Sequence, residues 1–196
     1  SGSTEWDLCG RVSGSADHPM CDRGASELAD AIRALDLKTA DLVLHGPDEA
    51  GTKTAELVAS LARSKARGRD GLAEVTMGLW EGLLPADLED RYPTVYARWL
   101  DDPTSVSVPE GEPLLEADAR VRSAFLKAVE KVPNEGTVVL VLRPIAWALM
   151  RCRLKARPLS EIWDTARKAA QVEALDCQTQ ALQDAGVGAE GAAAQA

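Results

Sequence analysis

Histidine is scarce in this sequence, which holds only two in 196 residues, His18 and His45. Its four cysteines are also scattered, and no two of them form a C-x-x-C pair: Cys9, Cys21, Cys152 and Cys177. So few soft ligands predict no metal site and no cofactor. We interpret the cysteines as reduced thiols and expect a cytoplasmic protein.

Long apolar runs and excess positive charge are missing as well. No stretch approaches the ~20 apolar residues of a membrane-spanning helix, and the first residues lack the basic-then-apolar layout of a signal peptide. The 22 basic residues are outnumbered by 31 acidic ones, which gives a net charge of −9. Nucleic acids and anionic membrane surfaces both require a basic footprint. We therefore expect neither as the main partner.

The pattern that is present indicates one α/β domain. Apolar runs predict buried strands at 41–45 and 137–142, with a weaker candidate at 72–75. Helical spacing predicts helices over 24–35, 52–65, 85–100 with a break at Pro93, 114–132 and 159–182. Pro144 fits the first turn of one more helix, and 101–113 is typical of a loop.

Alternation of strands and helices predicts a three-layer α/β/α sandwich with a mostly parallel sheet. We expect a single domain over residues 1–184. The alanine-, glycine- and glutamine-rich residues 185–196 are expected to form a flexible tail.

Several short motifs stand in a fixed order along the chain. They are Ser3-Thr4-Glu5-Trp6-Asp7, Asp17-His18-Pro19-Met20, Gly78-Leu79-Trp80-Glu81-Gly82 and Gly111-Glu112-Pro113. In order and spacing they resemble the phosphoglycerate mutase-like branch of the histidine phosphatase superfamily, over residues 1 to about 154. The resemblance implies a phosphoglycerate mutase-like fold and phosphoryl transfer through a histidine. It also makes a homodimer a reasonable expectation.

At the positions where this family handles phosphate, the chain has other residues. Aligned on Gly2, the nucleophilic histidine corresponds to Ser1, which is a poor nucleophile without an adjacent base. The clamping arginine corresponds to Ala50, so its bidentate donors are absent. The second histidine corresponds to Arg143, which stays protonated and cannot shuttle protons. Asp7 replaces an amide, and its carboxylate would repel a phosphate dianion.

One acid is retained. Glu74, four residues before Gly78, matches the family's proton donor. The alternative is a surface carboxylate at the end of a strand. We favour a position in the wall of a pocket, because of the Gly78-Leu79-Trp80-Glu81-Gly82 motif beside it.

A rebuilt pocket for a small anion is a further hypothesis. Its candidates are Arg11, His45 and Arg143, beside Gly2 and Asp7. The alternative is that His45 is a loop histidine with satisfied hydrogen bonds, and that both arginines pair with nearby acids such as Asp7. We favour this alternative.

We therefore predict a pseudoenzyme that binds an anionic ligand or a protein partner, because losing even one preorganised donor typically costs about 10²–10³ in rate. The alternative is a working phosphomonoesterase or phosphomutase whose first strand and catalytic residues are missing from this chain. In the family a central strand leads into the catalytic turn, whereas here the match begins at Ser1. A third class, a hydrolase that uses His45 and Glu74, has no support from spacing.

Overall fold

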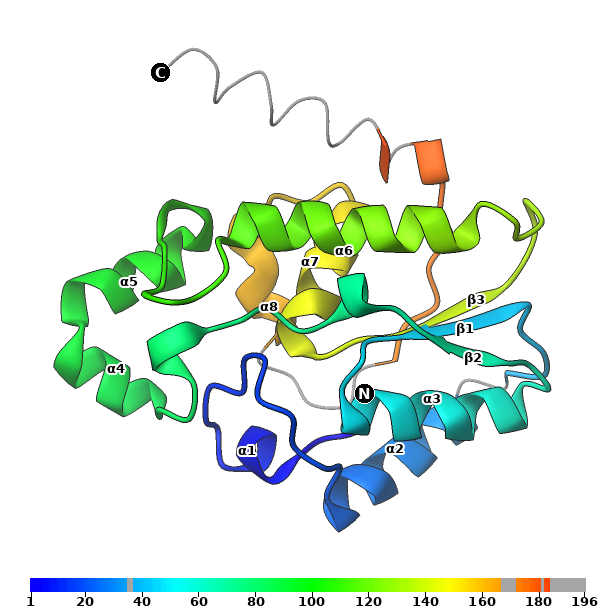
Figure 1. The fold of residues 1–196 in the computed structure, drawn as a ribbon, viewed down its shortest axis with the longest axis horizontal. Helices are drawn as coiled ribbons and strands as arrows, with labels where there is room; N and C mark the ends of the chain where they lie inside the picture. Colours follow the sequence, from blue (N-terminus) through cyan, green and yellow to red (C-terminus); the bar gives the residue numbers. More distant parts are fainter. Residues whose placement is uncertain (35–36, 167–171, 181, 184–196) are drawn as a thin grey trace.

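The computed structural model describes residues 1–34, 37–166, 172–180 and 182–183 (Figure 1). The tail expected at 185–196 lies outside these residues. Within them, no helix combines the length and apolar character needed to cross a membrane.

Three parallel strands form the sheet in the order β2-β1-β3. β1 (Leu42–His45) lies in the middle and pairs with β2 (Ala66–Gly68) and with β3 (Val138–Val141). Leu44 of β1 faces Arg67 on one side and Leu140 on the other. Every residue of β1 is buried, as expected for a strand covered on both faces.

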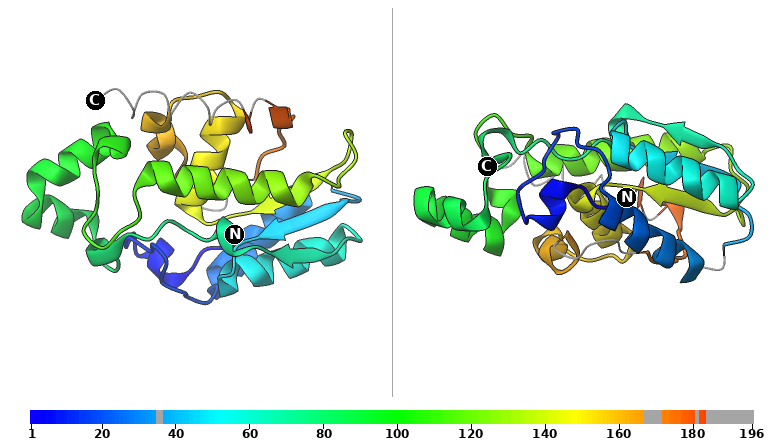
Figure 2. Two further views of the ribbon diagram at one scale, coloured as in Figure 1. Left: turned by 45° about the horizontal axis from the view of Figure 1, so that its top comes forward. Right: turned by 90° about the horizontal axis from the view of Figure 1, so that it is seen from below.

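Helices cover both faces of this sheet (Figure 1, Figure 2). On one face α2 (Asp22–Ala34) and α3 (Glu49–Leu61) pack Leu28 and Val58 against Val43. On the other face α6 (Leu114–Val129) and α7 (Pro144–Leu154) pack Phe125 and Met150 against Leu44. The predicted three-layer α/β/α architecture is confirmed.

The remaining elements lie beyond the ends of the strands. They are α1 (Glu5–Leu8), α4 (Pro85–Arg91), α5 (Pro93–Asp101), α8 (Trp163–Ala166) and the short 3₁₀ helices η1 (Asp70–Leu72), η2 (Gly78–Trp80), η3 (Pro103–Ser105) and η4 (Leu159–Ile162). A second apolar core gathers there around Trp80, whose indole packs edge-on against Trp99 at a centroid distance of 5.8 Å. The break predicted at Pro93 is confirmed, since α4 ends at Arg91 and α5 begins at Pro93.

Two sequence predictions of secondary structure are wrong, and a third is confirmed with shifted bounds. The strand expected at 72–75 is absent, because 70–72 form η1; the third strand is instead the short and largely exposed β2. The helix expected from 52 begins at Glu49, because the Asp48 carboxylate accepts the Gly51 N–H at 2.7 Å and caps it there. In the described part of 159–182, the expected long helix is replaced by the short η4 and α8, and residues 172–178 are not helical.

A buried ion pair joins α6 to α7. Both carboxylate oxygens of Asp118, which is 3% exposed, accept hydrogen bonds from Arg153 at 2.7–3.1 Å. Arg122 lies 3.8 Å from the same carboxylate. The Asp118 carboxylate therefore compensates the charges of two guanidinium groups.

We expect Asp118→Ala to lower the free energy of unfolding by about 3–5 kcal/mol, because removing one partner of a buried pair leaves the other charge uncompensated. Urea denaturation monitored by tryptophan fluorescence measures this. Asp30→Ala is the matched control, because the Asp30–Arg33 pair is 70% and 74% exposed and should contribute less than about 0.5 kcal/mol. Equal effects of the two substitutions would contradict the prediction.

Candidate functional site

The first three residues lie between the carboxyl end of β3 and helix α3. The amino group of Ser1 donates to the Leu142 carbonyl at 2.8 Å, and the Gly2 N–H donates to the Thr54 hydroxyl at 3.0 Å. Gly2 is tightly enclosed, since a Cβ there would lie 2.2 Å from the Met20 sulfur. Burial, followed by the charge of Arg143, lowers the pKa of the Ser1 amino group from 8.0 to about 6.

Asp7 is held in place by three different residues. Its Oδ2 accepts the N–H and the hydroxyl of Thr4 at 2.7 and 2.8 Å, which caps α1. Its Oδ1 accepts the Ser13 hydroxyl at 2.9 Å. The guanidinium of Arg143 completes the set, with Nη2 3.0 Å from Oδ1 and Nη1 2.9 Å from Oδ2. Burial would raise the pKa of Asp7, but Arg143 and Thr4 bring it below its ordinary value of 3.8.

Arg143 follows β3 and immediately precedes α7. Its side chain is 4% exposed. Both terminal nitrogens contact Asp7, so its charge is compensated within the protein. This is the pairing between Arg143 and Asp7 that the sequence analysis favoured.

Glu74 caps the amino end of α7. Its Oε1 accepts the N–H groups of Val75 and Ala146, and its Oε2 accepts the N–H of Ile145, all at 2.8 Å. The first N–H groups of a helix have no partner within the helix, and a carboxylate there also complements the helix dipole. Burial raises the pKa of Glu74 above its ordinary value of 4.5, although these N–H groups and Arg143 act in the opposite direction.

Arg120 of α6 supports the loop that carries Glu74. It donates to the carbonyls of Gly71 and Ala73 at 3.1 Å each. Glu112 holds the same guanidinium through two contacts of 2.7 and 2.6 Å. Through Arg120, the motif at 111–113 therefore helps to position Glu74.

Glu74 and Arg143 line a small cleft of about 140 Å³. The other lining residues are Gly14, Ser15, Ala16, Asp17, Pro47, Asp48 and Ala73. Its walls thus bring three carboxylates to one guanidinium, and that guanidinium is already paired with Asp7. Such a charge balance opposes the entry of a phosphate dianion.

The other sequence candidates lie outside this cleft. His45 is 7% exposed, and its Nδ1 lies 2.6 Å from the Gly46 carbonyl oxygen. Its ring thus has a hydrogen-bond partner, as the alternative expected, but it ends strand β1 and does not lie in a loop. Arg11 donates to the carbonyl of Gly82 at 2.6 Å rather than to an acid. Ala50 is fully buried within α3.

The second histidine, His18, is not among the residues that line the cleft. Its ring lies against Trp6 at a centroid distance of 4.0 Å, with the two planes tilted by 39°. Sequence reasoning missed Thr54, which anchors Gly2. In the sequence, Thr54 is marked by its position one helical turn after Ala50 in α3.

Comparisons with known proteins agree with this fold. The family model described as histidine phosphatase superfamily (branch 1) matches residues 1–184. Phosphoserine phosphatase 1 of Hydrogenobacter thermophilus is 28% identical over 160 residues, which cover 82% of this chain and 75% of that protein.

Two solved structures are similar to this chain. "Mycobacterial hydrolase 1" has a TM-score of 0.73 at 21% identity and covers 82% of this chain and 78% of its own. Mycobacterial glucosyl-3-phosphoglycerate phosphatase has a TM-score of 0.71 at 21% identity and covers 82% and 79%. At this identity the two structures support the fold alone.

We expect the two buried carboxyl groups to titrate in opposite directions from their ordinary values. Asp7 should titrate below 3.8 and Glu74 above 4.5. Arg143→Met should raise the pKa of both, because the guanidinium lowers both. Carbon-13 NMR of labelled carboxyl groups measures this, with Arg11→Met as the control that moves neither. Glu74 titrating at or below Asp7 would contradict the assignment.

The same shifts fix how stability depends on pH. Asp7 stabilises the fold above its unfolded-state pKa, and this contribution is lost as the pH falls through its lower folded-state pKa. Glu74 behaves oppositely, and its contribution is lost as the pH rises from about 4.5 through its raised folded-state pKa. Asp7→Asn should therefore destabilise the protein at pH 7, with a deficit that shrinks as the pH falls below about 3.8. A deficit independent of pH, measured by urea denaturation, would oppose this account.

Proposed function

With the chain established as a member of the histidine phosphatase superfamily (branch 1), we propose that it binds a ligand or a protein partner through this fold. We propose further that it does so without transferring a phosphoryl group. The observation that carries the proposal is the Asp7–Arg143 ion pair. The pair places an internal carboxylate on the basic side chain that lines the cleft. An entering phosphate would have to displace Asp7 and then lie beside Glu74 and Asp48.

The absence of an attacking group supports the same proposal. Ser1 stands at the position of the family's nucleophile, and neither His18 nor His45 is directed to it by its contacts. A serine hydroxyl needs an adjacent base to attack phosphorus at neutral pH. The carboxylates whose charges act on Ser1 are all engaged, Asp48 with the amino end of α3, Asp7 with Arg143 and Glu74 with the amino end of α7.

Glu74 has a structural role that needs no catalysis. Its hydrogen bonds from the N–H groups of Ile145 and Ala146 fix the start of α7 and hence the position of Arg143. We infer that the ligand of the cleft, if it is a small molecule, carries at most one negative charge. A monoanion such as a carboxylate would match the single charge of Asp7 opposite Arg143, whereas a dianion would be repelled more strongly by the acidic wall.

A second candidate is a phosphomonoesterase or phosphomutase whose first strand and catalytic residues are missing from this chain. The relatives favour it, since the protein that is 28% identical is named a phosphoserine phosphatase. The raised pKa of Glu74 also favours it, because a carboxyl group that holds its proton to higher pH suits the protonation of a leaving group.

Hydrolysis of an aryl phosphate between pH 4 and 9 separates the two candidates. The proposal predicts phosphate release no faster than in buffer alone, because a nucleophile and two phosphate-holding groups are replaced. Turnover that is lost in Glu74→Gln and in Arg143→Met, with both variants still folded by circular dichroism, would establish the second candidate instead.

Calorimetric titration with inorganic phosphate tests the role of the ion pair. We expect no measurable binding to the unmodified chain and binding at least roughly tenfold tighter in Asp7→Asn, equivalent to about 1.4 kcal/mol. The physical reason is that Asn frees the Arg143 guanidinium. The double variant Asp7→Asn/Arg143→Met should lose the gain. Tight phosphate binding by the unmodified chain would refute the proposal.

A further inference from the structure

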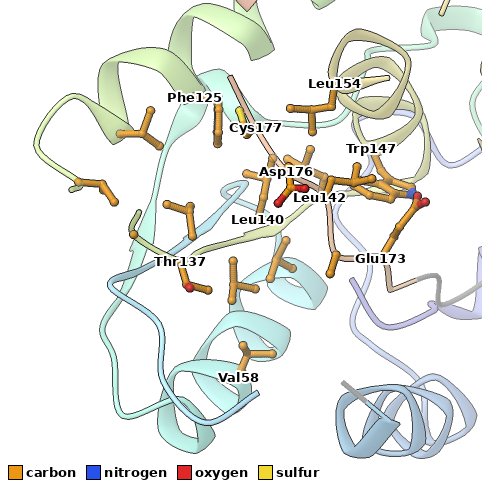
Figure 3. A pocket seen from close by; sticks show the side chains of 18 of the residues that line it. Val58, Phe125, Thr137, Leu140, Leu142, Trp147, Leu154, Glu173, Asp176 and Cys177 are labelled. Carbon is orange, nitrogen blue, oxygen red and sulfur yellow. The ribbon is translucent and has the colours of Figure 1, made fainter. Parts of the chain in front are cut away.

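The two edges of the sheet differ in what lies beside them. At the β3 edge, the chain's own residues 173–177 line a cavity of about 850 Å³ together with Leu140 and Leu142 (Figure 3). At the other edge, β2 pairs with β1 on one side, and no other strand of the described residues pairs with it. An edge strand presents backbone N–H and C=O groups that another extended chain can bind.

The hydrogen bonds of β2 indicate which backbone groups point outward. The Lys65 carbonyl and the Arg69 N–H both bond to backbone groups of β1, at 3.3 and 2.9 Å. Because the direction of these groups alternates along a strand, those of Ala66 and Gly68 point away from β1. The Arg69 guanidinium already donates to the Gly68 carbonyl at 2.9 Å. The outer edge of β2 therefore offers the N–H groups of Ala66 and Gly68 and the carbonyl of Ala66.

The side chains along this edge carry one sign of charge. Four of the seven residues 63–69 are basic and none is acidic, although acidic residues outnumber basic ones in the whole chain. Arg63, Lys65 and Arg67 are exposed, and none of them forms an ion pair with a described residue. Alternation along the strand places Lys65, Arg67 and Arg69 on the same face. Positive charge is thus concentrated here without compensation.

Prevention of self-association accounts for only part of this pattern. Charged side chains on an edge strand keep two copies apart, because pairing of the copies would set like charges opposite each other. Charges of either sign would achieve this, whereas all four charges here have the sign that is the minority in the chain. A cluster of that kind matches an anionic partner.

The size of the basic segment restricts that partner. Residues 65–69 span roughly 16 Å of extended chain. The net charge of −9 opposes an extended polyanion such as a nucleic acid or an anionic membrane, which would also meet the acidic remainder of the surface. A short acidic segment of a protein can be confined to the basic strand.

We propose that β2 binds an acidic, extended segment of a partner protein, which pairs with the outer edge of β2 as an added strand. The partner's backbone bonds to the outward groups of Ala66 and Gly68. Its carboxylates, at alternate positions, pair with Lys65, Arg67 and Arg69. None of these residues lines the cleft, so the inference does not depend on whether the cleft transfers a phosphoryl group.

Three fluorescein-labelled peptides test this proposal. Glu-Val-Glu-Val-Glu carries carboxylates at alternate positions. Glu-Val-Glu-Pro-Glu keeps all three side-chain charges but lacks one N–H that strand pairing needs. Gln-Val-Gln-Val-Gln keeps every N–H but lacks the side-chain charges. Fluorescence anisotropy measures the affinity, and hydrogen exchange of the Ala66 and Gly68 amides reports whether a strand is added.

Two protein variants complete the test. Arg67→Glu reverses one charge of the basic strand. Arg91→Glu is the matched control, because it changes the net charge equally at an exposed position of α4, at the opposite end of the molecule (Figure 1, Figure 2). Circular dichroism verifies that both variants are folded.

We expect Glu-Val-Glu-Val-Glu to bind at least roughly tenfold more tightly than either other peptide, because it alone combines ion pairs with strand pairing. At saturation it should slow exchange of the Ala66 and Gly68 amides by about fivefold or more. Arg67→Glu should weaken its binding by about tenfold or more, and Arg91→Glu by less than about twofold.

Several results would overturn the proposal. The first is no binding of Glu-Val-Glu-Val-Glu, and the second is equal binding of the proline peptide or unchanged exchange of both amides, which would indicate charge attraction without strand pairing. A single-stranded oligonucleotide that binds more tightly than the peptide, and is weakened by Arg67→Glu, would assign the edge to nucleic acid. Slower exchange that grows with protein concentration in the absence of peptide would assign it to a second copy.

Discussion

The ion pair between Asp7 and Arg143 joins the first helix to the carboxyl end of the sheet, and the character of the cleft depends on it. Both groups are largely buried, with side chains 16% and 4% exposed. An unpaired guanidinium there would be costly, so the fold commits Asp7 to it. The same commitment removes the positive charge that a phosphate would need. We therefore propose that the stability of the amino-terminal segment and the rejection of a dianion have one physical cause.

Glu74 illustrates how the fold can require a residue whether or not that residue takes part in catalysis. The amino end of α7 requires acceptors for its N–H groups, and the carboxylate provides them from a loop held by Arg120. Replacing it would disturb the start of α7 and with it Arg143, even in a protein without catalysis. The identity of this residue alone is thus weak evidence for an active site.

The sequence predicts the central part of the fold well, because buried strands and amphipathic helices leave strong periodic patterns. Val138–Val141 and Leu42–His45 are apolar on both faces, and the prolines at 85, 93 and 144 mark helix starts. The strand β2 escapes prediction because Ala66-Arg67-Gly68 is short and largely exposed, so its place is set by pairing with β1.

The pairing of opposite charges in the site could be predicted from the sequence. The particular hydrogen-bond partners of each side chain could not. The pairing of Arg143 with an acid follows from their opposite charge, but its bidentate geometry depends on Thr4 and Ser13 holding the carboxylate. Arg11 carries the same charge as Arg143 and donates to the carbonyl of Gly82 instead. Local sequence carries no signal for such long-range neighbours.

The central claim is that this cleft cannot accept a phosphoryl group on a side chain. Intact-protein mass spectrometry of the chain, quenched in acid or in base during incubation with an aryl phosphate, tests it most directly. The account predicts the unmodified mass at every time point under both quenches. A phosphorylated side chain that forms and decays while the substrate is consumed would contradict it.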